Sequence, residues 1–511
     1  MKKVIKLLLS RMFIIAFMVF LQLGWVVLIL YDASRKSDIV QALIHILALV
    51  IVMLVLQRWN NPSIKLGWVF LILAVPLVGV PVYLIFGRKG LTKKTRLRMG
   101  EASKDMERTV VQNPKVWEHL SAVDERALVQ SNYLLQKANA PVYEHTHTTY
   151  FTCGEEMFPR MLEDIRQAKR YIFLEYFILD RGQMYDQLVD ALAERVRAGV
   201  EVRLIYDDFG CMGKMPAHFY RELQQKGIKC AAFNTVRPIM AIIMNHRDHR
   251  KLLSIDGTIS YTGGINIADE YVNRIDRFGY WKDTGVRMEG DASISVTRYF
   301  LEMWDYIVNT KEELGDFLPE PMSDSIESQG FVQPYVDTPL DAENVGENVY
   351  LNLINRATRY VYFFTPYLVL DQELMIAFEN AAKSGVDVRL VLPGIPDKKL
   401  VYCLSRSHYK KLVEAGVKIY EYTPGFLHAK CAVCDDEYAT VGSINLDYRS
   451  LYLHFECGVF MVHTPVVKSL YDDFDRVFRE SKQITPEMCQ RKHPFVVELF
   501  YTFLRLIAPL L

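Results

Sequence analysis

The first ninety residues alternate between long apolar runs and short polar connections. Three runs, over residues 12–31, 39–56 and 67–86, contain no Lys, Arg, Asp or Glu and are 18 to 20 residues long. A helix needs about 20 predominantly apolar residues to cross the hydrocarbon core of a bilayer. The runs lack the polar faces of helices buried in a soluble domain. The pattern therefore predicts a membrane anchor over residues 1–92 with two to three transmembrane segments.

Positive charge flanks this anchor at both ends. Four basic residues lie at or before position 11, and the third run is followed by Arg88, Lys89, Lys93, Lys94, Arg96 and Arg98 without an acid among them. The positive-inside rule predicts a multi-pass protein of the cell membrane whose remaining chain is cytoplasmic. No small-residue cleavage site follows the first run, which favours a retained anchor over a signal peptide. Three spans cannot keep both flanks inside. Either the N-terminus is outside or one run re-enters or lies in the interface, and residues 39–56, the shortest run, best suit that exception.

Beyond the anchor the hydrophobic pattern changes to strand, helix and strand, and it does so twice. Residues 166–180 resemble residues 355–371, and residues 191–208 resemble residues 377–394. Each copy has an apolar strand, an amphipathic helix, a glycine and a second strand rich in Val and Leu, which is the pattern of a βαβ unit. Duplicated lobes tend to pair about a pseudo-twofold axis, which can bring two copies of one motif face to face.

The predicted fold class is therefore α/β, with two duplicated lobes preceded by N-terminal transmembrane helices. The domain boundaries that follow are 1–92 for the anchor, 93–320 for lobe 1, 321–485 for lobe 2 and 486–511 for an amphipathic C-terminal helix.

A short polar motif recurs at corresponding places in the two copies. It consists of His-x-Lys, an Asp five residues after the Lys, and then Gly-Gly or Gly-Ser followed by x-Asn. Its members are His249, Lys251, Asp256, Gly264 and Asn266 in the first copy and His428, Lys430, Asp435, Ser443 and Asn445 in the second. One such His and Lys is usually a surface pair, but two copies in matching repeat positions make coincidence improbable.

The spacing of the motif indicates its chemistry. Residues two apart in a strand point to the same face, so each copy presents an imidazole and an ammonium to a shared cleft. Each Asp lies seven residues beyond its His, so in an unbroken strand its side chain points away, nearer to structure than to chemistry. The glycines permit close backbone approach and the asparagines supply amide donors. Two cations and amides, arranged twice, predict a binding site for a phosphodiester.

Composition limits the alternatives. Sixty Lys and Arg balance sixty Asp and Glu, so the chain lacks the overall basic character of nucleic-acid binders. The eight cysteines follow no zinc-site or disulfide spacing. Cys431 and Cys434 form a C-x-x-C, which leaves redox or metal chemistry open, but they lie on an apolar strand pattern that suits small buried residues. The sequence predicts neither a metal nor a cofactor, and no nucleic-acid partner.

These motifs resemble the phospholipase D superfamily, whose H-x-K-x-x-x-x-D motif occurs twice per active site, and within it the bacterial cardiolipin synthases. Residues 62–88 and the stretches LEYFI, YDDFG, GGINIADEY, TPYLVLD, YTPGFLHAK and GSINLDYRS appear in family order. The resemblance implies transfer of a phosphatidyl group between two phosphatidylglycerol molecules, giving cardiolipin and glycerol through a phosphohistidine. The partners implied are phosphatidylglycerol and membrane lipid, and no protein partner is indicated.

The resemblance also assigns roles. The catalytic motif would be His249, Lys251 and Asp256 with His428, Lys430 and Asp435. It favours His249 as nucleophile and His428 as acid and then base, in agreement with the cations that crowd His249 in the sequence. Gly264, Asn266, Ser443 and Asn445 would bind substrate. Each imidazole would be oriented by an acid, and the candidates are Glu456, expected beside His428, and Asp283 as its counterpart in the first lobe.

Two further stretches could contact lipid. The apolar residues 238–244 directly precede the first motif and suit either a lip that touches acyl chains or a buried strand. Glu498, Thr502 and Arg505 form one polar stripe on an otherwise apolar C-terminal helix. That stripe favours a helix in the membrane interface, and packing on the lobes is the alternative.

Other functions remain possible from the motifs alone. The same chemistry serves phospholipid hydrolysis and synthesis of other phospholipids such as phosphatidylserine, because the pocket selects the acceptor. A nuclease is disfavoured by the neutral charge and the apolar runs. A catalytically dead membrane scaffold would be expected to have lost a His or a Lys, and both copies are intact.

Overall fold

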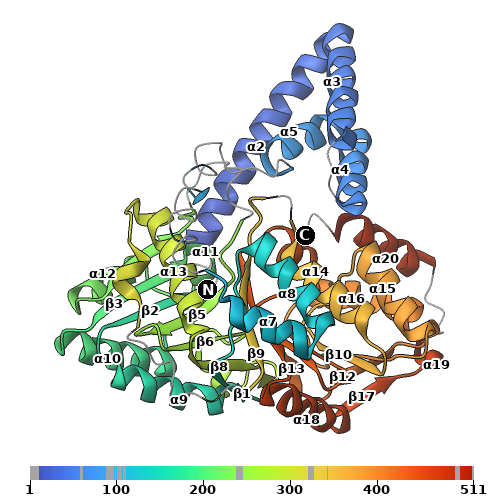
Figure 1. The fold of residues 1–511 in the computed structure, drawn as a ribbon. Helices are drawn as coiled ribbons and strands as arrows, with labels where there is room; N and C mark the ends of the chain where they lie inside the picture. Colours follow the sequence, from blue (N-terminus) through green and yellow to red (C-terminus); the bar gives the residue numbers. More distant parts are fainter. Residues whose placement is uncertain are drawn as a thin grey trace. The chain divides into compact units, whose positions relative to one another are not determined.

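The computed structural model describes residues 11–57, 61–87, 97, 99–100, 106, 111–236, 246–319, 327, 329–341, 343–489 and 495–508. These residues form two compact units, and Figure 1 shows their elements. One unit contains both α/β lobes. The other contains the described residues before position 94, those from 234 to 246, and those after position 492. Each unit is described by itself.

Lobe 1 is built on a seven-stranded mixed sheet with the order β1-β8-β6-β5-β2-β3-β4. The strands are β1 (Thr146–Phe151), β2 (Tyr171–Tyr176), β3 (Glu201–Asp207), β4 (Lys229–Phe233), β5 (Lys251–Ile255), β6 (Ile259–Gly263) and β8 (Gly285–Gly290). The helices are α9 (Gly154–Gln167), α10 (Gln183–Arg197), α11 (Asp208–Cys211), α12 (Phe219–Gln225) and α13 (Ser293–Val308), with short 3-10 helices at Asp269–Val272 and Leu314–Phe317. Helices α7 (Pro114–Val123) and α8 (Glu125–Ala138) precede β1 in the chain, but α8 contacts β9 (Phe331–Asp337) and α14 (Val345–Arg356) of lobe 2.

Strand β2 shows why the central strands of lobe 1 are apolar on both faces. All of its residues are buried, as expected where helices cover both sides of a sheet. Ile172 and Leu174 share a core cluster with residues of α9 and α10. Phe173, which alternates with them, stacks on Phe300 of α13 with the ring centroids 4.7 Å apart. The sheet therefore lies between α9 and α10 on one face and α13 on the other.

Lobe 2 repeats this plan with an eight-stranded sheet in the order β17-β12-β11-β10-β14-β15-β16-β9. Its strands are β9 (Phe331–Asp337), β10 (Tyr360–Phe364), β11 (Asp387–Pro393), β12 (Lys418–Tyr422), β14 (Cys431–Cys434), β15 (Tyr438–Gly442), β16 (Glu456–Val462) and β17 (Ser481–Ile484). Its helices are α14 (Val345–Arg356), α15 (Gln372–Lys383), α16 (Lys399–Glu414), α17 (Tyr448–Tyr452), α18 (Pro465–Arg479) and α19 (Pro486–Cys489).

The strand orders of the two sheets correspond. Read from the opposite edge, lobe 2 runs β9-β16-β15-β14-β10-β11-β12, matching lobe 1 strand for strand, with β17 added beyond β12. The lobes contact each other through β6 and β8 of lobe 1 and β15 and β16 of lobe 2. A short parallel pair, β7 (Tyr280–Lys282) and β13 (Gly425–Leu427), also joins them. The expectation of two similar α/β lobes is confirmed.

The other unit consists of α2 (Arg11–Lys36), α3 (Asp38–Gln57), α4 (Pro62–Ala74), α5 (Pro76–Phe86) and α20 (Phe495–Ile507). In the described part of the chain, α3 is the one helix long and apolar enough to cross a membrane. Many of the large apolar side chains of α2 and α3 are exposed, among them Trp25, Leu28 and Met53. Residues 39–56 were expected to be the run that re-enters the membrane or lies in its interface. They instead form the best candidate span.

The third apolar run is not one helix, contrary to the expectation for residues 67–86. Pro76 has no N–H to donate and disfavours helical dihedrals at the preceding residue, and the chain leaves the helix at Val75, with φ −140° and ψ 75°. The rings of Trp68 and Tyr83 lie 5.3 Å apart. In a continuous helix these residues would be separated by about 22 Å along the axis. The chain therefore turns back, and α4 and α5 form a helical hairpin.

The predicted polar stripe of the C-terminal helix is present in α20. Glu498, Thr502 and Arg505 are exposed, but so are Leu499 and Phe503, at 58% and 46%. Helix α20 contacts α4 and belongs to the unit of the N-terminal helices rather than to that of the lobes. Residues 238–244, the other predicted lipid-contacting stretch, lie outside the described residues.

Gly79 allows the close approach of the two arms of the hairpin. A Cβ at this position would lie 2.3 Å from the carbonyl oxygen of Leu71. We expect Gly79→Ala to destabilise the unit of N-terminal helices by about 1–3 kcal/mol, because the backbone must shift to admit a methyl group. Thermal unfolding of the full chain in detergent measures this.

Gly24→Ala is the matched control. Gly24 lies inside α2, and a Cβ added there would have no other atom within 4 Å. Ala is also a better helix former than Gly by about 1 kcal/mol. The variant should leave the unfolding temperature unchanged or raise it. Equal losses in both variants would contradict the close packing of the hairpin.

Candidate active site

The first motif histidine is held by an acid from the other lobe. His249 precedes β5 by two residues, and its backbone N–H donates to the carbonyl of Phe455, 2.9 Å away. Its Nδ1 lies 2.9 and 3.0 Å from Oε1 and Oε2 of Glu456, the first residue of β16. A carboxylate on Nδ1 fixes the ring and directs Nε2 away from that acid.

The second motif histidine has the reciprocal arrangement. His428 follows β13, and its backbone N–H donates to the carbonyl of Lys282, 2.7 Å away. Its Nδ1 lies 2.6 Å from Oδ2 of Asp283. The expected pairing of Glu456 with His428 is wrong. Each acid holds the histidine of the other lobe, because the strands that carry the acids lie at the boundary between the lobes.

The two histidines belong to one electrostatic environment. Burial lowers the pKa of His249 well below its ordinary value, and Lys251, His454, Lys430 and His428 lower it further. Burial and Lys430 lower the pKa of His428 to about 4, against the opposing effect of Asp283. Since Lys430 and His428 act on His249, the two motif copies face a common site, as the repeat predicted.

The motif lysines are buried beside their histidines. The Nζ of Lys251 donates to the carbonyl of His249, and the Nζ of Lys430 donates to the carbonyl of His428. Burial lowers the pKa of Lys251 to about 8 and that of Lys430 to about 7. Burial of unpaired positive charge is costly, and a bound phosphodiester anion would favour the charged ammonium groups.

The two orienting acids differ in their surroundings. Burial raises the pKa of Glu456 to about 8, although Lys251 and Ser443 act against this. Burial acts in the same direction on Asp283, but Lys430 and His428 overcome it and lower the pKa of that carboxyl. Asp283 is thus the more firmly ionised of the pair.

Gly264 and Ser443, predicted to bind substrate, instead contact these acids. A Cβ on Gly264 would lie 2.1 Å from Oδ1 of Asp283, so a side chain there would displace the acid. At the matching position the Ser443 hydroxyl donates to Oε2 of Glu456 and accepts the backbone N–H of Cys457 at 3.0 Å. Both positions therefore support the orienting acids.

The motif asparagines are buried. Asn266 accepts the backbone N–H of Ile178 at 3.0 Å and donates to the hydroxyl of Tyr271 at 2.8 Å. Its amide is thus engaged by the protein. Asn445 is 5% exposed, and its Oδ1 is buried without a hydrogen-bond partner among the described residues. A direct role for either amide at a phosphoryl oxygen stays a prediction.

The motif aspartates have structural contacts. Asp256 accepts the backbone N–H groups of Lys169, Arg170 and Tyr171 at 2.7 to 2.9 Å. Asp435 accepts those of three consecutive residues in lobe 2, Thr358, Arg359 and Tyr360, at 2.6 to 2.9 Å. Both have positive φ, 54° and 53°, at the turns after β5 and β14. These hydrogen bonds hold the strand ends within each lobe, in agreement with the structural role that the odd spacing suggested. They do not support the catalytic role that came with the motif.

Aromatic side chains surround the histidines, and sequence reasoning missed them. Tyr271, Trp281 and Phe426 place their ring centroids 5.5 to 5.6 Å from that of His428. Phe177 lies 5.1 Å from His249 and His454 lies 5.6 Å from it. Trp281 and His454 each precede an orienting acid by two residues, and that period-two spacing was the available signal.

The two cysteines of the C-x-x-C lie on a strand of lobe 2. Cys431 and Cys434 are buried on β14, all eight cysteines are free, and burial raises the pKa of both thiols. They serve as small buried residues.

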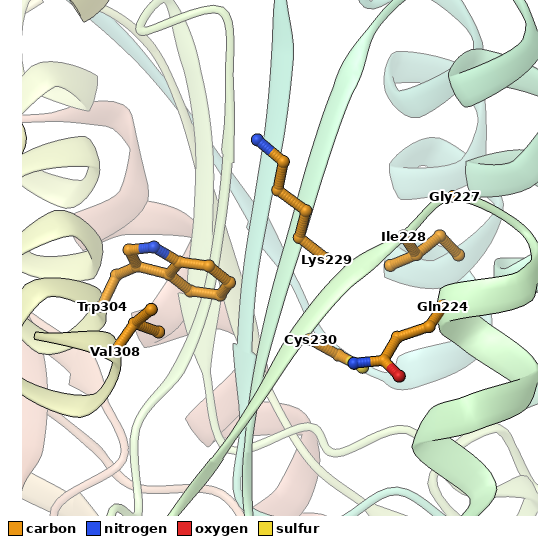
Figure 2. A pocket seen from close by; sticks show the side chains of 7 residues that line it. All are labelled: Gln224, Gly227, Ile228, Lys229, Cys230, Trp304 and Val308. Carbon is orange, nitrogen blue, oxygen red and sulfur yellow. The ribbon is translucent and has the colours of Figure 1, made fainter. Parts of the chain in front are cut away.

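A pocket of about 310 Å³ lies elsewhere in lobe 1. Figure 2 shows Trp304 and Val308 of α13 on one side of it and Gln224, Ile228 and Cys230 on the other. None of its lining residues belongs to either motif, so it is separate from the candidate active site.

Paired His and Lys from duplicated lobes, with an acid behind each imidazole, define a site of the phospholipase D class. The family model described as "Cardiolipin synthase, PLD-like domain" matches residues 161–304 and 350–478, and "Phospholipase_D-nuclease N-terminal" matches residues 43–88. The chain belongs to the cardiolipin synthase family of PLD-like proteins. The resemblance drawn from the motifs is confirmed, and the N-terminal match agrees with membrane association.

Individual relatives agree with the family. A cardiolipin synthase of Geobacillus sp. (strain WCH70) is 35% identical over 458 residues, which cover 88% of this chain and 90% of that protein. An uncharacterised protein of Streptococcus mutans is 40% identical over 445 residues, 87% of this chain and 96% of its own. The crystal structure of phosphatidylserine synthase from Haemophilus influenzae Rd KW20 has a TM-score of 0.57 at 15% identity, covering 76% of this chain and all of that one. It shares the fold.

Substitution of Asp256 and Asp435 tests whether these carboxylates stabilise the fold or take part in turnover. In Asp256→Asn or Asp435→Asn, an amide NH₂ would face backbone N–H donors. We expect a loss of about 1–3 kcal/mol of unfolding free energy in each variant, while the folded fraction keeps near-normal turnover. Thermal unfolding and the rate per folded molecule separate the two effects.

Asp436→Asn is the matched control, since Asp436 is the exposed neighbour of Asp435 and also has positive φ, 62°. Its carboxylate accepts the Tyr360 hydroxyl at 2.7 Å, which an amide oxygen can also do, and pairs with the exposed Arg359. Its effect should stay within about 0.5 kcal/mol. Loss of turnover in folded Asp256→Asn would show that this carboxylate acts in the chemistry.

Proposed function

We propose that this chain is a cardiolipin synthase that transfers a phosphatidyl group from one phosphatidylglycerol to another, releasing glycerol. The observation that carries the proposal is the pair of motif histidines, each with Nδ1 on a buried carboxylate of the opposite lobe. Membership of the family and the named activity of the Geobacillus relative support it.

The first half-reaction forms a phosphohistidine. Nε2 of His249 attacks phosphorus, so a P–N bond forms and the P–O bond to glycerol breaks. The imidazolium of His428 gives its proton to the departing glycerol oxygen. Lys251 and Lys430 stabilise the charge that builds on the phosphoryl oxygens.

The second half-reaction reverses these roles. His428, now neutral, removes the proton from a glycerol hydroxyl of the second phosphatidylglycerol. The new P–O bond forms as the P–N bond breaks, which restores His249 and gives cardiolipin. The net exchange is one alcohol for another at phosphorus, with no water consumed and no redox change.

The electrostatic difference between the histidines supports this order. The pKa of His249 lies well below its ordinary value, and burial and four neighbouring bases lower it. A neutral ring is the attacking form. Burial and Lys430 lower the pKa of His428 to about 4, so this ring is also neutral before substrate binds, but the ionised Asp283 on its Nδ1 acts in the opposite direction and favours its protonation. An anionic phosphodiester in the cleft would add to that effect.

The membrane arrangement we propose has two spans and a re-entrant hairpin. Helix α3 is the candidate span, and we add α2 as the second because its residues 12–31 contain no Lys, Arg, Asp or Glu. Helices α4 and α5 enter and leave on the cytoplasmic side. The arms of the hairpin have 13 and 11 residues, about 20 and 16 Å of helix, which is short of the hydrocarbon core of about 30 Å. An even number of spans keeps both basic flanks and both lobes in the cytoplasm. Three spans would have placed the two flanks on opposite sides.

Purified protein given phosphatidylglycerol alone tests the activity. We expect cardiolipin and glycerol in equal amounts by mass spectrometry. Phosphatidic acid as the main product would identify a hydrolase, another phospholipid formed only with an added alcohol would identify a different transferase, and no product would identify a scaffold.

The histidine variants test the division of roles in the same assay. His249→Ala should remove the covalent phosphatidyl adduct that is trapped when turnover is quenched with denaturant at neutral pH, where the P–N bond survives, and His428→Ala should slow turnover by about 10²–10⁴-fold. His119→Ala, at an imidazole that is 53% exposed, should retain full activity. An adduct that maps to His428 and not to His249 would reverse the assignment.

Single cysteines test the topology in a background where the native cysteines are replaced. Ser37 lies between α2 and α3, and Ser63 lies at the start of α4. We expect a membrane-impermeant maleimide added to intact cells to label Ser37→Cys and to label Ser63→Cys only after permeabilisation. Labelling of Ser63→Cys in intact cells would rule out the re-entrant arrangement.

A further inference from the structure

Strand register identifies equivalent positions next to the two histidines. In lobe 1, Gly263 of the motif pairs with Gly285, and in lobe 2 Gly442 pairs with Gly458. Each orienting acid precedes its glycine by two residues. Two residues earlier still, lobe 1 has Trp281 and lobe 2 has His454. These two side chains therefore occupy equivalent positions.

The equivalent residues contact their histidines at the same spacing but differ in chemistry. The ring of Trp281 lies 5.5 Å from that of His428, and the ring of His454 lies 5.6 Å from that of His249. An indole offers a metal no ligand atom, whereas an imidazole does. One ligand atom each from His249, His454 and Glu456 lies within 4.8 Å of the others. Only the lobe 2 position adds a third ligand.

The distances suit coordination of one ion. Nδ1 of His249 and Nδ1 of His454 lie 2.9 and 3.9 Å from the same oxygen, Oε1 of Glu456. Zinc bonds to nitrogen and oxygen measure about 2.0–2.1 Å, so tetrahedral ligand atoms lie about 3.3 Å apart. Both observed separations are within about 0.6 Å of that value, a shift that small side-chain rotations can supply. Two imidazoles and one carboxylate, with a fourth position open, suit Zn²⁺ rather than Mg²⁺ or Ca²⁺.

Two buried carboxylates lie in the cleft and offset part of the positive charge of the lysines. Glu456 is itself a ligand of the proposed site, and Asp283 contacts His428. A metal ion binds the deprotonated forms of imidazole and carboxyl groups and releases their protons on binding.

We propose that His249, His454 and Glu456 form a binding site for a divalent transition-metal ion such as Zn²⁺, and that the bound ion inhibits the transferase. A cation on Nδ1 would withdraw electron density from Nε2 and remove Glu456 as the partner of the ring. The inhibitory effect rests on the proposed role of His249 as nucleophile. The metal site itself does not.

Calorimetric titration of the full chain in detergent with ZnCl₂ tests the site without reference to activity. We expect one class of binding to weaken by more than about tenfold in His454→Asn. His463→Asn is the matched control, because His463 also pairs with a single acid, its Nε2 lying 3.1 Å from Asp124, but has no second imidazole. Zinc binding that is unchanged in His454→Asn overturns the proposal.

Trp281→His provides the gain-of-site variant. It would place a third ligand beside His428 and Asp283, and we expect the zinc stoichiometry to rise by one. A folded Trp281→His protein with unchanged stoichiometry would contradict the equivalence of the two positions. If this variant does not fold, the His454→Asn titration still decides the question.

Inhibition is measured on phosphatidylglycerol, with each rate normalised to the zinc-free rate of the same variant. The half-inhibitory zinc concentration should rise more than about tenfold in His454→Asn and stay unchanged in His463→Asn. Zinc bound at His454 without inhibition would overturn the inhibitory role. A metal-free protein that makes no cardiolipin would refute the proposed function instead, and the titration would still stand.

Discussion

The crossed contacts between acids and imidazoles are the interaction on which the site depends. Glu456 of lobe 2 holds His249 of lobe 1, and Asp283 of lobe 1 holds His428 of lobe 2. Neither lobe therefore contains a complete histidine and acid pair. The backbone makes the same exchange, since His249 donates to Phe455 and His428 donates to Lys282. Catalytic geometry and the packing of the lobes are thus one property, and a shift between the lobes would misorient both rings at once.

Burying these charged groups costs free energy in the empty cleft, and a bound anion offsets that cost. The cleft concentrates two lysines and two histidines that are nearly inaccessible to water, and their pKa values are lowered accordingly. Two carboxylates offset part of the positive charge. A phosphodiester brings one further negative charge to a position surrounded by nitrogen bases. The same electrostatic interaction then favours both binding of the anion and protonation of His428, the proposed general acid.

Sequence reasoning reached the parts of the site that local patterns encode. The spacing of His249 and Lys251, repeated at His428 and Lys430, was enough to predict that the two motif copies face one site, and strand alternation correctly turned Asp256 away from it. The pairing of the acids was beyond that reasoning, because Glu456 lies 207 residues from His249 in the chain and only the packed strands bring the two together. The same holds for Gly264 and Ser443, whose partners are side chains of neighbouring strands.

The membrane segment shows a different limit. Residues 67–86 have the length and apolarity of a span, and composition alone cannot separate one long helix from two short ones. The information was present in Pro76 and Gly79, since a proline removes a backbone donor and a glycine admits a close contact, but either residue is also tolerated in spanning helices. The ring contact of Trp68 and Tyr83 decides between them, and it is a tertiary contact.

Duplication explains why the site has two histidines, and divergence explains why they need not be interchangeable. Lobe 1 combines the short acid Asp283 with Gly264 and Trp281, whereas lobe 2 combines the longer Glu456 with Ser443 and His454. The three differences are linked. A Cβ at Gly264 would strike Asp283, while the Ser443 hydroxyl needs a carboxylate within reach. His428 consequently faces an ionised acid and apolar rings, and His249 faces a more basic carboxyl and a second imidazole. A twofold-symmetric ancestor would give two equivalent bases. These substitutions give the two rings different surroundings, which is the basis for the proposal that one attacks phosphorus and the other carries the proton.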